Sequence, residues 1–260
     1  MSIAEGVTVA VEVHNILKKS GIYEQAEDFL KRRRPYPVLV VGSSGAGKSS
    51  LIKSLKGENG FVPRVTGRSD RTEVEKGRLG SAPFEFHVTP GEVLHEAKRS
   101  TTIREIMGND EIGVIDVVSY GYHEPDVDIS DVITGSGVKK AFLEQRRELE
   151  INSLPSWTEI LCGEGGPCRW VITVVSKADL WWAPKTEKEV IDHYRIGDYH
   201  KGLGSASRSA RVTHSVAPFS SISQPLFGRV RMSGYYSDNL RAQHHNELVA
   251  LMLRYASAAK

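Results

Sequence analysis

Short apolar runs recur along the chain, and the segments between them are long enough to hold a helix. Five of the runs combine β-branched and aromatic residues over lengths that are typical of strands. Strands that alternate with helix-length segments predict a mostly parallel sheet with helices on both faces, which is a three-layer α/β fold. The five runs lie at 38–41, 83–88, 112–118, 170–175 and 212–217.

Helical spacing of apolar positions fills several of the intervening segments. It predicts helices at 49–55, 92–107 and 138–152. A last apolar stripe, spaced mainly by three and four residues, predicts a C-terminal helix that packs on the sheet. Its members are Leu240, His244, Leu248, Leu251, Met252 and Tyr255.

A hairpin is predicted where polar and apolar residues alternate, at 72–75 and again at 84–88. This period of two is typical of half-buried strands, and residues 79–82 between them favour a turn. The hairpin adds one antiparallel edge strand to an otherwise parallel sheet, an arrangement that is common in α/β proteins.

The N-terminal residues 1–36 have helical periodicity with a break at Ser20–Gly21. They predict a short helical extension in front of a single larger domain at 37–260. The basic run at 31–34 closes the second helix, where cations favour the negative end of the helix dipole. Contact of this run with a membrane or nucleic acid is the alternative, and we favour the dipole explanation.

Composition restricts the possible partners. The 260 residues include 34 Lys and Arg against 32 Asp and Glu, so the formal net charge of +2 gives no general reason to expect nucleic acid or an anionic membrane as partner. No stretch approaches the ~18 consecutive apolar residues of a membrane helix. Without a secretory signal, Cys162 and Cys168 are interpreted as reduced thiols. We therefore expect a soluble cytoplasmic protein.

The stretch GSSGAGKSS directly follows the first predicted strand and opens a predicted helix. This is the context that a phosphate-binding P-loop requires, because glycines let backbone N–H groups surround phosphate oxygens at the positive end of the helix. Lys48 would reach the β- and γ-phosphates, and the Ser49 hydroxyl would ligate Mg²⁺. The expected contacts are Gly42, Ser43, Ser44, Gly45, Ala46, Gly47, Lys48, Ser49 and Ser50.

A second motif follows the strand at 170–175 and reads Ser176-Lys177-Ala178-Asp179. The aspartate can accept hydrogen bonds from N1–H and the exocyclic amine of guanine, whereas adenine offers no such pair of donors on that edge. A mismatched base would leave a desolvated carboxylate without partners, which favours discrimination. The stem of Lys177 can cover the purine face.

These residues resemble the P-loop GTPases of the translation-factor-related class. GSSGAGKSS looks like their phosphate motif, and Ser176-Lys177-Ala178-Asp179 looks like a variant of their NKxD or TKxD motif. The phosphate motif is similar to those of septin, dynamin-like, immunity-related and Era-like GTPases. The resemblance covers about residues 37–260 and implies a Ras-like fold, GTP or GDP as ligand, and Mg²⁺ as cofactor.

The remaining family motifs are sought residue by residue. Thr72, just before the hairpin, stands where the first switch threonine is expected; it would complete the Mg²⁺ coordination and join Lys48 as a catalytic residue. Thr66 is the competing choice. Ser220 and Ser221 follow the last predicted strand and resemble the family's final guanine motif.

The second switch departs from the family pattern. The family has Asp-x-x-Gly, whereas this chain has Val88-Thr89-Pro90-Gly91, so the acidic partner of the metal-bound water is replaced by valine. Valine accepts no hydrogen bond, which weakens the expected Mg²⁺ site, although the Gly91 amide can still contact the γ-phosphate. Glu92 follows, where many relatives carry a glutamine.

Two functions remain open on this evidence: a Mg²⁺-dependent GTPase switch, which we favour, and a GTP-binding scaffold that does not hydrolyse. An ATP-dependent kinase is a third and weaker alternative, because it needs an adenine site in place of Asp179. A partner or effector protein is expected, with the long connection at 119–137 as a candidate surface. Homodimerisation across the nucleotide is a further hypothesis.

Overall fold

The computed structural model describes residues 34–57, 73–80, 82–90, 96–123, 128–135, 137–184, 186–204, 212–221, 230 and 232–258. The predicted N-terminal helices lie outside the described residues, and so do Thr66, Thr72, Gly91 and Glu92.

A six-stranded sheet forms the centre of the molecule, with strand order β2-β3-β1-β4-β7-β8. Only β2 and β3 pair in antiparallel fashion; the other neighbours are parallel. The predicted mostly parallel sheet with one antiparallel edge strand is therefore confirmed. The strands are β1 (Tyr36–Val41), β2 (Glu73–Leu79), β3 (Ala82–Val88), β4 (Ile112–Val118), β7 (Cys168–Val175) and β8 (Thr213–Pro218).

Burial along the strands follows their place in the sheet. Every residue of β4 is buried, as expected for a central parallel strand covered on both faces. The edge strand β2 alternates between half-buried and exposed positions until its last residue. Its register with β3, from Glu73 opposite Val88 to Leu79 opposite Ala82, fixes the hairpin.

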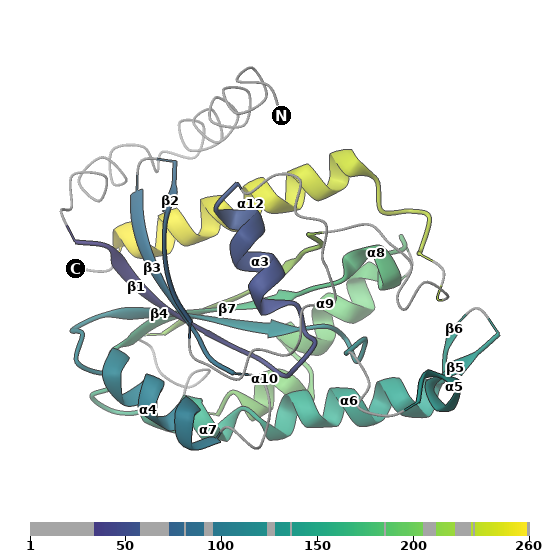
Figure 1. The fold of residues 1–260 in the computed structure, drawn as a ribbon, viewed down its shortest axis with the longest axis horizontal. Coiled ribbons are helices and arrows are strands. Elements are labelled where there is room, and N and C mark those ends of the chain that lie inside the picture. The colour runs from purple at the N-terminus through teal and green to yellow at the C-terminus, as the bar shows by residue number, and fades with distance from the viewer. Residues whose placement is uncertain are drawn as a thin grey trace.

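Helices cover both faces of the sheet, with α3 and α12 on one side and α4, α6, α7 and α10 on the other (Figure 1). A two-stranded hairpin of β5 (Ile133–Thr134) and β6 (Gly137–Val138) precedes α6. The helices are α3 (Lys48–Leu55), α4 (Glu96–Ile106), α5 (Ile129–Val132), α6 (Lys140–Asn152), α7 (Pro155–Leu161), α8 (Ala178–Trp181), α9 (Glu187–Arg195), α10 (Asp198–Gly202) and α12 (Asp238–Ala258).

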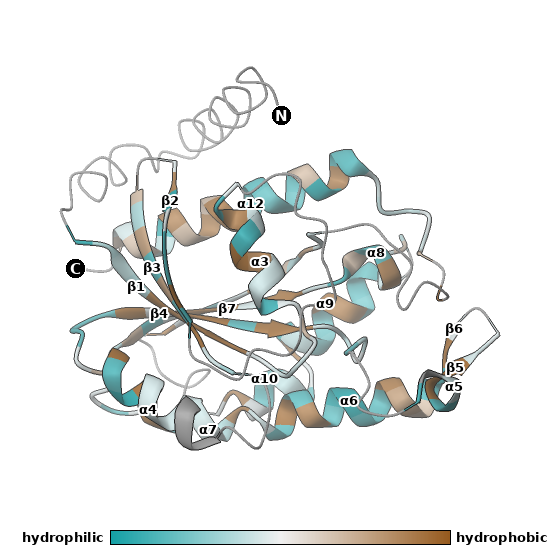
Figure 2. Cartoon of the chain, viewed as in Figure 1, coloured by the Kyte–Doolittle hydropathy of each residue, from teal (hydrophilic) through white to brown (hydrophobic). Residues whose placement is uncertain are grey.

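Two separate cores lie on the two sides of the sheet. We call the side beneath α3 and α12 the α3 face; the buried strand side chains that build its core are all hydrophobic, and they include Phe84, Phe86 and Trp170. We call the opposite side the α6 face; its core contains apolar strand residues such as Leu39 and Val114 and the helical Trp157. The central strands are correspondingly brown in Figure 2.

Most predicted elements are confirmed, but several helices were missed. The predicted helices at 49–55, 138–152 and the C-terminus correspond to α3, α6 and α12. The short helices α7, α8, α9 and α10 were not predicted. The connection at 119–137, interpreted as a long loop, contains α5 and β5 in its described part.

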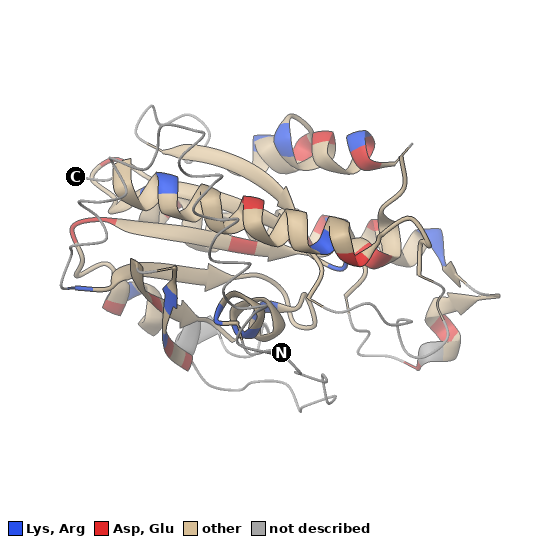
Figure 3. Ribbon diagram, turned by 90° about the horizontal axis from the view of Figure 1, so that it is seen from above, with Lys and Arg blue, Asp and Glu red and all other residues tan. Residues whose placement is uncertain are grey.

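Charged residues of both signs are interspersed along the helices (Figure 3). Among the described residues, no helix combines the length and apolarity needed to cross a bilayer. Cys162 and Cys168 are buried free thiols at the end of α7 and the start of β7.

Candidate nucleotide site

The glycine loop between β1 and α3 has a backbone that side chains rarely tolerate. Gly42 has a φ of 133°, and a Cβ there would lie 2.2 Å from the Val117 carbonyl oxygen on β4. Gly47, with a φ of 99°, is the N-cap of α3. The loop is therefore pressed against the sheet and turns directly into the helix, so the first N–H groups of α3, including those of Ser49 and Ser50, lie at the positive end of the helix dipole.

Lys48 closes this loop with its side chain. Its Nζ donates to the carbonyl oxygens of Gly42, at 2.8 Å, and Ser43, at 3.1 Å. The residue is only 8% exposed. The Lys48 ammonium group is thus held against the backbone of the glycine loop, which includes Ser43 and Ser44.

The end of β7 is bonded to the glycine loop. The Ser176 hydroxyl donates to the Ala46 carbonyl oxygen at 2.6 Å, although the two residues are 130 positions apart. Both residues are buried. The two motifs singled out in the sequence are therefore joined directly by a buried hydrogen bond.

Asp179 and Ser220 also lie together. The Ser220 hydroxyl donates to Oδ1 of Asp179 at 2.6 Å, and the neighbouring Ala178 N–H donates to the Phe219 carbonyl oxygen at 3.0 Å. Asp179 is 5% exposed and Ser220 3%. Ser221 follows as a half-buried residue. The Asp179 carboxylate is therefore held by the loop that follows β8.

Val88 is the last residue of β3, and its side chain lies in the core of the α3 face. This is the face covered by α3, the helix that contains Ser49. Its side chain carries no oxygen that could bind a metal-bound water. Asp116, the buried acid on β4 two strands away in the sheet, does not compensate, because its carboxylate accepts a hydrogen bond from the Tyr199 hydroxyl on the α6 face. Among the described residues, no cluster of three or more His, Cys, Asp or Glu side chains suits a metal.

Sequence reasoning missed a buried acid on α6 that binds the backbone directly after β4. Glu150 is 1% exposed and accepts hydrogen bonds from the N–H groups of Ser119, at 2.9 Å, and Gly121, at 3.3 Å, and from the Tyr194 hydroxyl, at 2.6 Å. Burial raises its pKa to about 7. Its sequence neighbours Glu144 and Glu148 are exposed, so no local pattern marks it.

His123 was missed as well. It is 1% exposed, and its Nε2 lies 3.4 Å from Oε1 of Glu150. Burial, assisted by the positive charges of Lys177, Arg146 and Lys48, lowers its pKa to about 3. The ring is therefore neutral at physiological pH and is buried near the two lysines that the sequence singled out.

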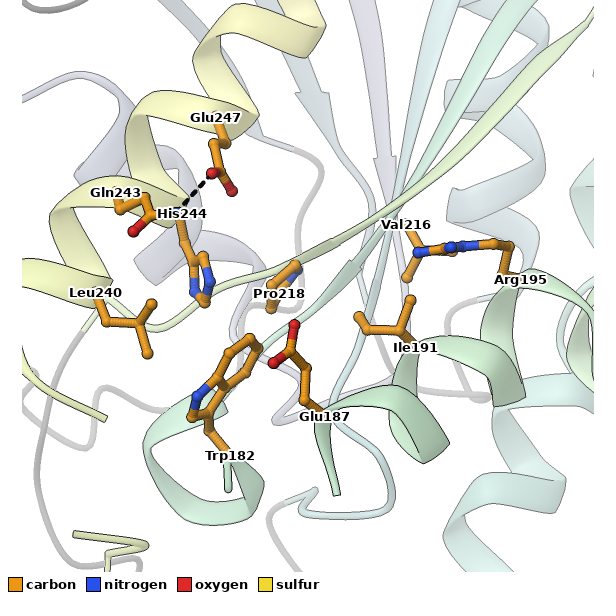
Figure 4. A pocket seen from close by; sticks show the side chains of 10 residues that line it. All are labelled: Trp182, Glu187, Ile191, Arg195, Val216, Pro218, Leu240, Gln243, His244 and Glu247. Atoms are coloured by element: carbon orange, nitrogen blue, oxygen red, sulfur yellow. Dashed lines mark hydrogen bonds between the residues drawn. The ribbon is translucent and has the colours of Figure 1, made fainter. Parts of the chain in front are cut away.

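A groove of about 350 Å³ lies elsewhere, between α9, β8 and α12 (Figure 4). None of its lining residues is a predicted nucleotide contact. It is therefore distinct from the candidate nucleotide site. Its walls are formed by Trp182, Glu187, Ile191, Arg195, Val216, Pro218, Leu240, Gln243, His244 and Glu247.

The strand order, the glycine loop after β1 and the motif after β7 together define the fold of the P-loop GTPases. The chain matches no known family model, and no curated protein sequence matches it. Solved structures of similar fold include Toc33 from Arabidopsis thaliana with GDP and Mg²⁺, with a TM-score of 0.51 and 18% identity, over 96% of this chain and 90% of that one.

Two further solved structures agree with this fold. Toc33 from Arabidopsis thaliana with Mg²⁺ and GMPPNP has a TM-score of 0.51 and 19% identity, over 96% of this chain and 92% of that one. A structure of the chloroplast translocon components atToc33 and psToc159 has a TM-score of 0.50 and 18% identity, over 95% and 90%. At these identities the likeness establishes the fold alone.

Proposed function

We propose that residues 37–260 form a guanine-nucleotide-binding domain that acts as a GTP-controlled switch. The observation that carries the proposal is the buried hydrogen bond from Ser220 to Asp179, because it holds a carboxylate just beyond the carboxyl ends of β7 and β8, where parallel sheets commonly bind ligands. The bond from Ser176 to Ala46 connects this carboxylate's loop to the glycine loop.

The phosphates would lie on the glycine loop. Lys48 Nζ would exchange its contacts with the Gly42 and Ser43 carbonyl oxygens for phosphate oxygens, which carry more negative charge. The N–H groups from Gly45 to Ser50 would supply further donors at the positive end of α3. Charge stabilisation of this kind supplies most of the catalysis of phosphoryl transfer.

Mg²⁺ fits this site only in part. Ser49 supplies one hydroxyl and the phosphates would supply further oxygens, with Thr72 proposed, ahead of Thr66, as the second protein ligand. Val88 supplies none. When bound, the ion would neutralise charge between the β- and γ-phosphates. We therefore propose that Mg²⁺ assists binding, with weaker retention than an aspartate at position 88 would give.

The absence of an acidic side chain at Val88 favours a second candidate, a GTP-binding scaffold that hydrolyses slowly or not at all. In that case the bound nucleotide would itself be the signal, sensed by the Gly91 amide. Both candidates share the guanine site and differ only in turnover.

The nucleotide preference is tested by calorimetric titration of the full chain with GDP, GTP, ADP and ATP in the presence of Mg²⁺. Guanine nucleotides are expected to bind, and Asp179→Ala to weaken them by about 100-fold through the loss of two hydrogen bonds to a charged group. Asp110→Ala, an exposed acid before β4, is the matched control and should bind normally. Preference for adenine nucleotides would overturn the proposal.

Turnover is tested by phosphate release from GTP at low and high protein concentration. A GTPase should lose activity in Lys48→Ala and keep it in Lys53→Ala, which lies on the same helix. Release no faster than in buffer would select the scaffold. In that case Val88→Asp, which introduces an acceptor on the side of Ser49, should raise the rate if the missing carboxylate is the cause.

The comparison of protein concentrations also tests a dimer. Dimerisation is described as important for the GTPase activity of atToc33 and psToc159. We propose by analogy that two copies of this chain, or this chain and a partner protein, meet across the nucleotide in the cytoplasm. Activity per molecule that rises with concentration would support a homodimer, and a constant value would contradict it.

A further inference from the structure

A five-residue loop after β4 lies between Glu150 and the base-reading motif. We call residues 119–123 the post-β4 loop. The backbone is strained at one residue of this loop, Tyr120, which has a φ of 52°. It is also strained at Lys177, which contacts the loop and has a φ of 55°. These two are the positive-φ residues other than glycine in the described part of the chain. Such conformations persist only where the surroundings hold them.

The post-β4 loop is held first by close packing on α6. Gly121 has a φ of 86°, and a Cβ at this position would lie 2.4 Å from the Leu143 carbonyl oxygen. Only glycine fits at such a distance. The loop therefore has no room to move toward α6.

Glu150 and Tyr194 then bind three successive N–H groups of the loop. Oε1 of Glu150 accepts from Ser119 and Gly121, at 2.9 and 3.3 Å, and the Tyr194 hydroxyl oxygen accepts from Tyr120 at 3.1 Å. The Tyr194 hydroxyl in turn donates to Oε2 of Glu150 at 2.6 Å. The two side chains thus form one connected anchor, and both are buried.

The other side of the loop contacts the base-reading motif. Lys177 Nζ donates to the Tyr122 carbonyl oxygen at 2.6 Å. This bond fixes the end of the side chain whose aliphatic stem is proposed to cover the purine. The chain of contacts therefore runs from Glu150 through the loop backbone to Lys177.

We propose that Glu150 is a positioning residue for the base end of the nucleotide site. With Tyr194 it fixes the post-β4 loop, and through Tyr122 the loop fixes Lys177. The inference rests on the proposed binding of guanine nucleotides and adds a residue that acts without touching the ligand. Because Ser176 bonds to Ala46 independently, loss of Glu150 should disturb the base end more than the phosphate end.

The charge of Glu150 provides a readout that a merely structural residue would lack. Its pKa is raised to about 7 by burial, so it ionises near neutral pH, and an ionised acceptor binds N–H groups more strongly. The groups that face it are Asp116 on β4, Tyr194 on α9, Tyr199 on α10, and His123, with Arg146 nearby on α6. The tyrosine pKa values are raised and that of His123 is lowered to about 3, so these three groups do not titrate near pH 7.

The experiment measures the affinity of the full chain for GDP and, as a probe of the phosphate end alone, for inorganic tripolyphosphate. Glu150→Ala should weaken GDP about 10-fold and tripolyphosphate less than about twofold. Tyr194→Phe, which keeps the ring, should change affinities in the same direction. Glu148→Gln, an exposed acid on the same helix, is the control and should leave both affinities unchanged.

A pH series completes the test and covers the case in which Glu150→Ala does not fold. From pH 6 to pH 8 the affinity for GDP should rise about threefold more in wild type than in Glu150→Gln, because the terminal phosphate of GDP ionises in both cases and Glu150 ionises only in wild type. Unchanged GDP affinity in the folded variants, equal losses for both ligands, or the same pH dependence in wild type and Glu150→Gln would overturn the proposal. Wild-type protein that binds no GDP would instead refute the proposed function, and this inference with it.

Discussion

The two faces of the sheet stabilise the candidate site in different ways. On the α3 face the fully buried strand side chains are hydrophobic, the half-buried Ser215 bonds to Tyr255 of α12, and the glycine loop is held by the close approach of Gly42 to Val117. On the α6 face the same sheet carries Asp116 and Thr173, which join Tyr199 in a buried hydrogen-bonded group. Glu150 and Tyr194 form a second such group nearby.

The difference shows which physical interaction positions each half of the site. The candidate phosphate end depends mainly on backbone shape and apolar packing, which a short contiguous motif can encode, with one added hydrogen bond from Ser176. The candidate base end depends on buried polar groups whose partners come from distant segments, namely Ser220 after β8, Glu150 on α6 and Tyr194 on α9. A buried polar group that loses one hydrogen-bond partner destabilises the fold. The free energy of unfolding should therefore fall when a single hydrogen-bonding atom is removed on the α6 face, and when side-chain volume is removed from the core on the α3 face.

The largest effect is expected from loss of volume on the α3 face. Phe86 is fully buried and stacks on Phe84 with ring centroids 6.0 Å apart. Phe86→Ala should lower the free energy of unfolding by about 3 to 5 kcal/mol, measured by urea denaturation. A loss below about 1 kcal/mol would show that this core is not close-packed.

A smaller effect is expected from removing one oxygen on the α6 face. The Tyr199 hydroxyl donates to Asp116, so Tyr199→Phe leaves a buried carboxylate with one donor fewer. The free energy of unfolding should fall by about 1 to 3 kcal/mol. Tyr235→Phe, at an exposed tyrosine, is the control and should cost nothing measurable. A loss in Tyr199→Phe no larger than that in Tyr235→Phe would contradict the proposed role of buried polar groups on the α6 face.

The fold was largely predictable because its strands are local apolar runs. The missed helices α8 and α10 contain 4 and 5 residues, which is too short for a helical period to be recognised. The glycine loop was predictable for the same local reason, since its residues are contiguous. Glu150 was not, because its burial depends on Tyr194, 44 positions away, and on the fold that brings the two together.

A third prediction concerns pH and isolates the charge on the α6 face. The pKa of Glu150 is raised in the folded chain from 4.5 to about 7, so between these values the native state holds a proton that the unfolded chain has lost. Stability from this group is therefore present at low pH and decreases as pH rises, by at most about 1.4 kcal/mol per pH unit.

The measurement for this third prediction is urea denaturation of wild type and Glu150→Gln at pH 5 and pH 6. The difference in unfolding free energy, wild type minus variant, should decrease between the two values. Taking the difference removes the opposite contribution of His123, whose lowered pKa destabilises the fold as pH falls. A difference that increased with pH would mean that Glu150 ionises more readily in the folded chain.

The central claim is that Asp179 reads guanine, and exchanging its carboxylate for an amide tests this most directly. Asp179→Asn keeps the shape and replaces one acceptor with a donor, which suits the C2 carbonyl of xanthine in place of the exocyclic amine of guanine. Wild type should bind GDP far more tightly than xanthosine diphosphate, and Asp179→Asn should reverse this order. A variant that still prefers GDP would contradict the account.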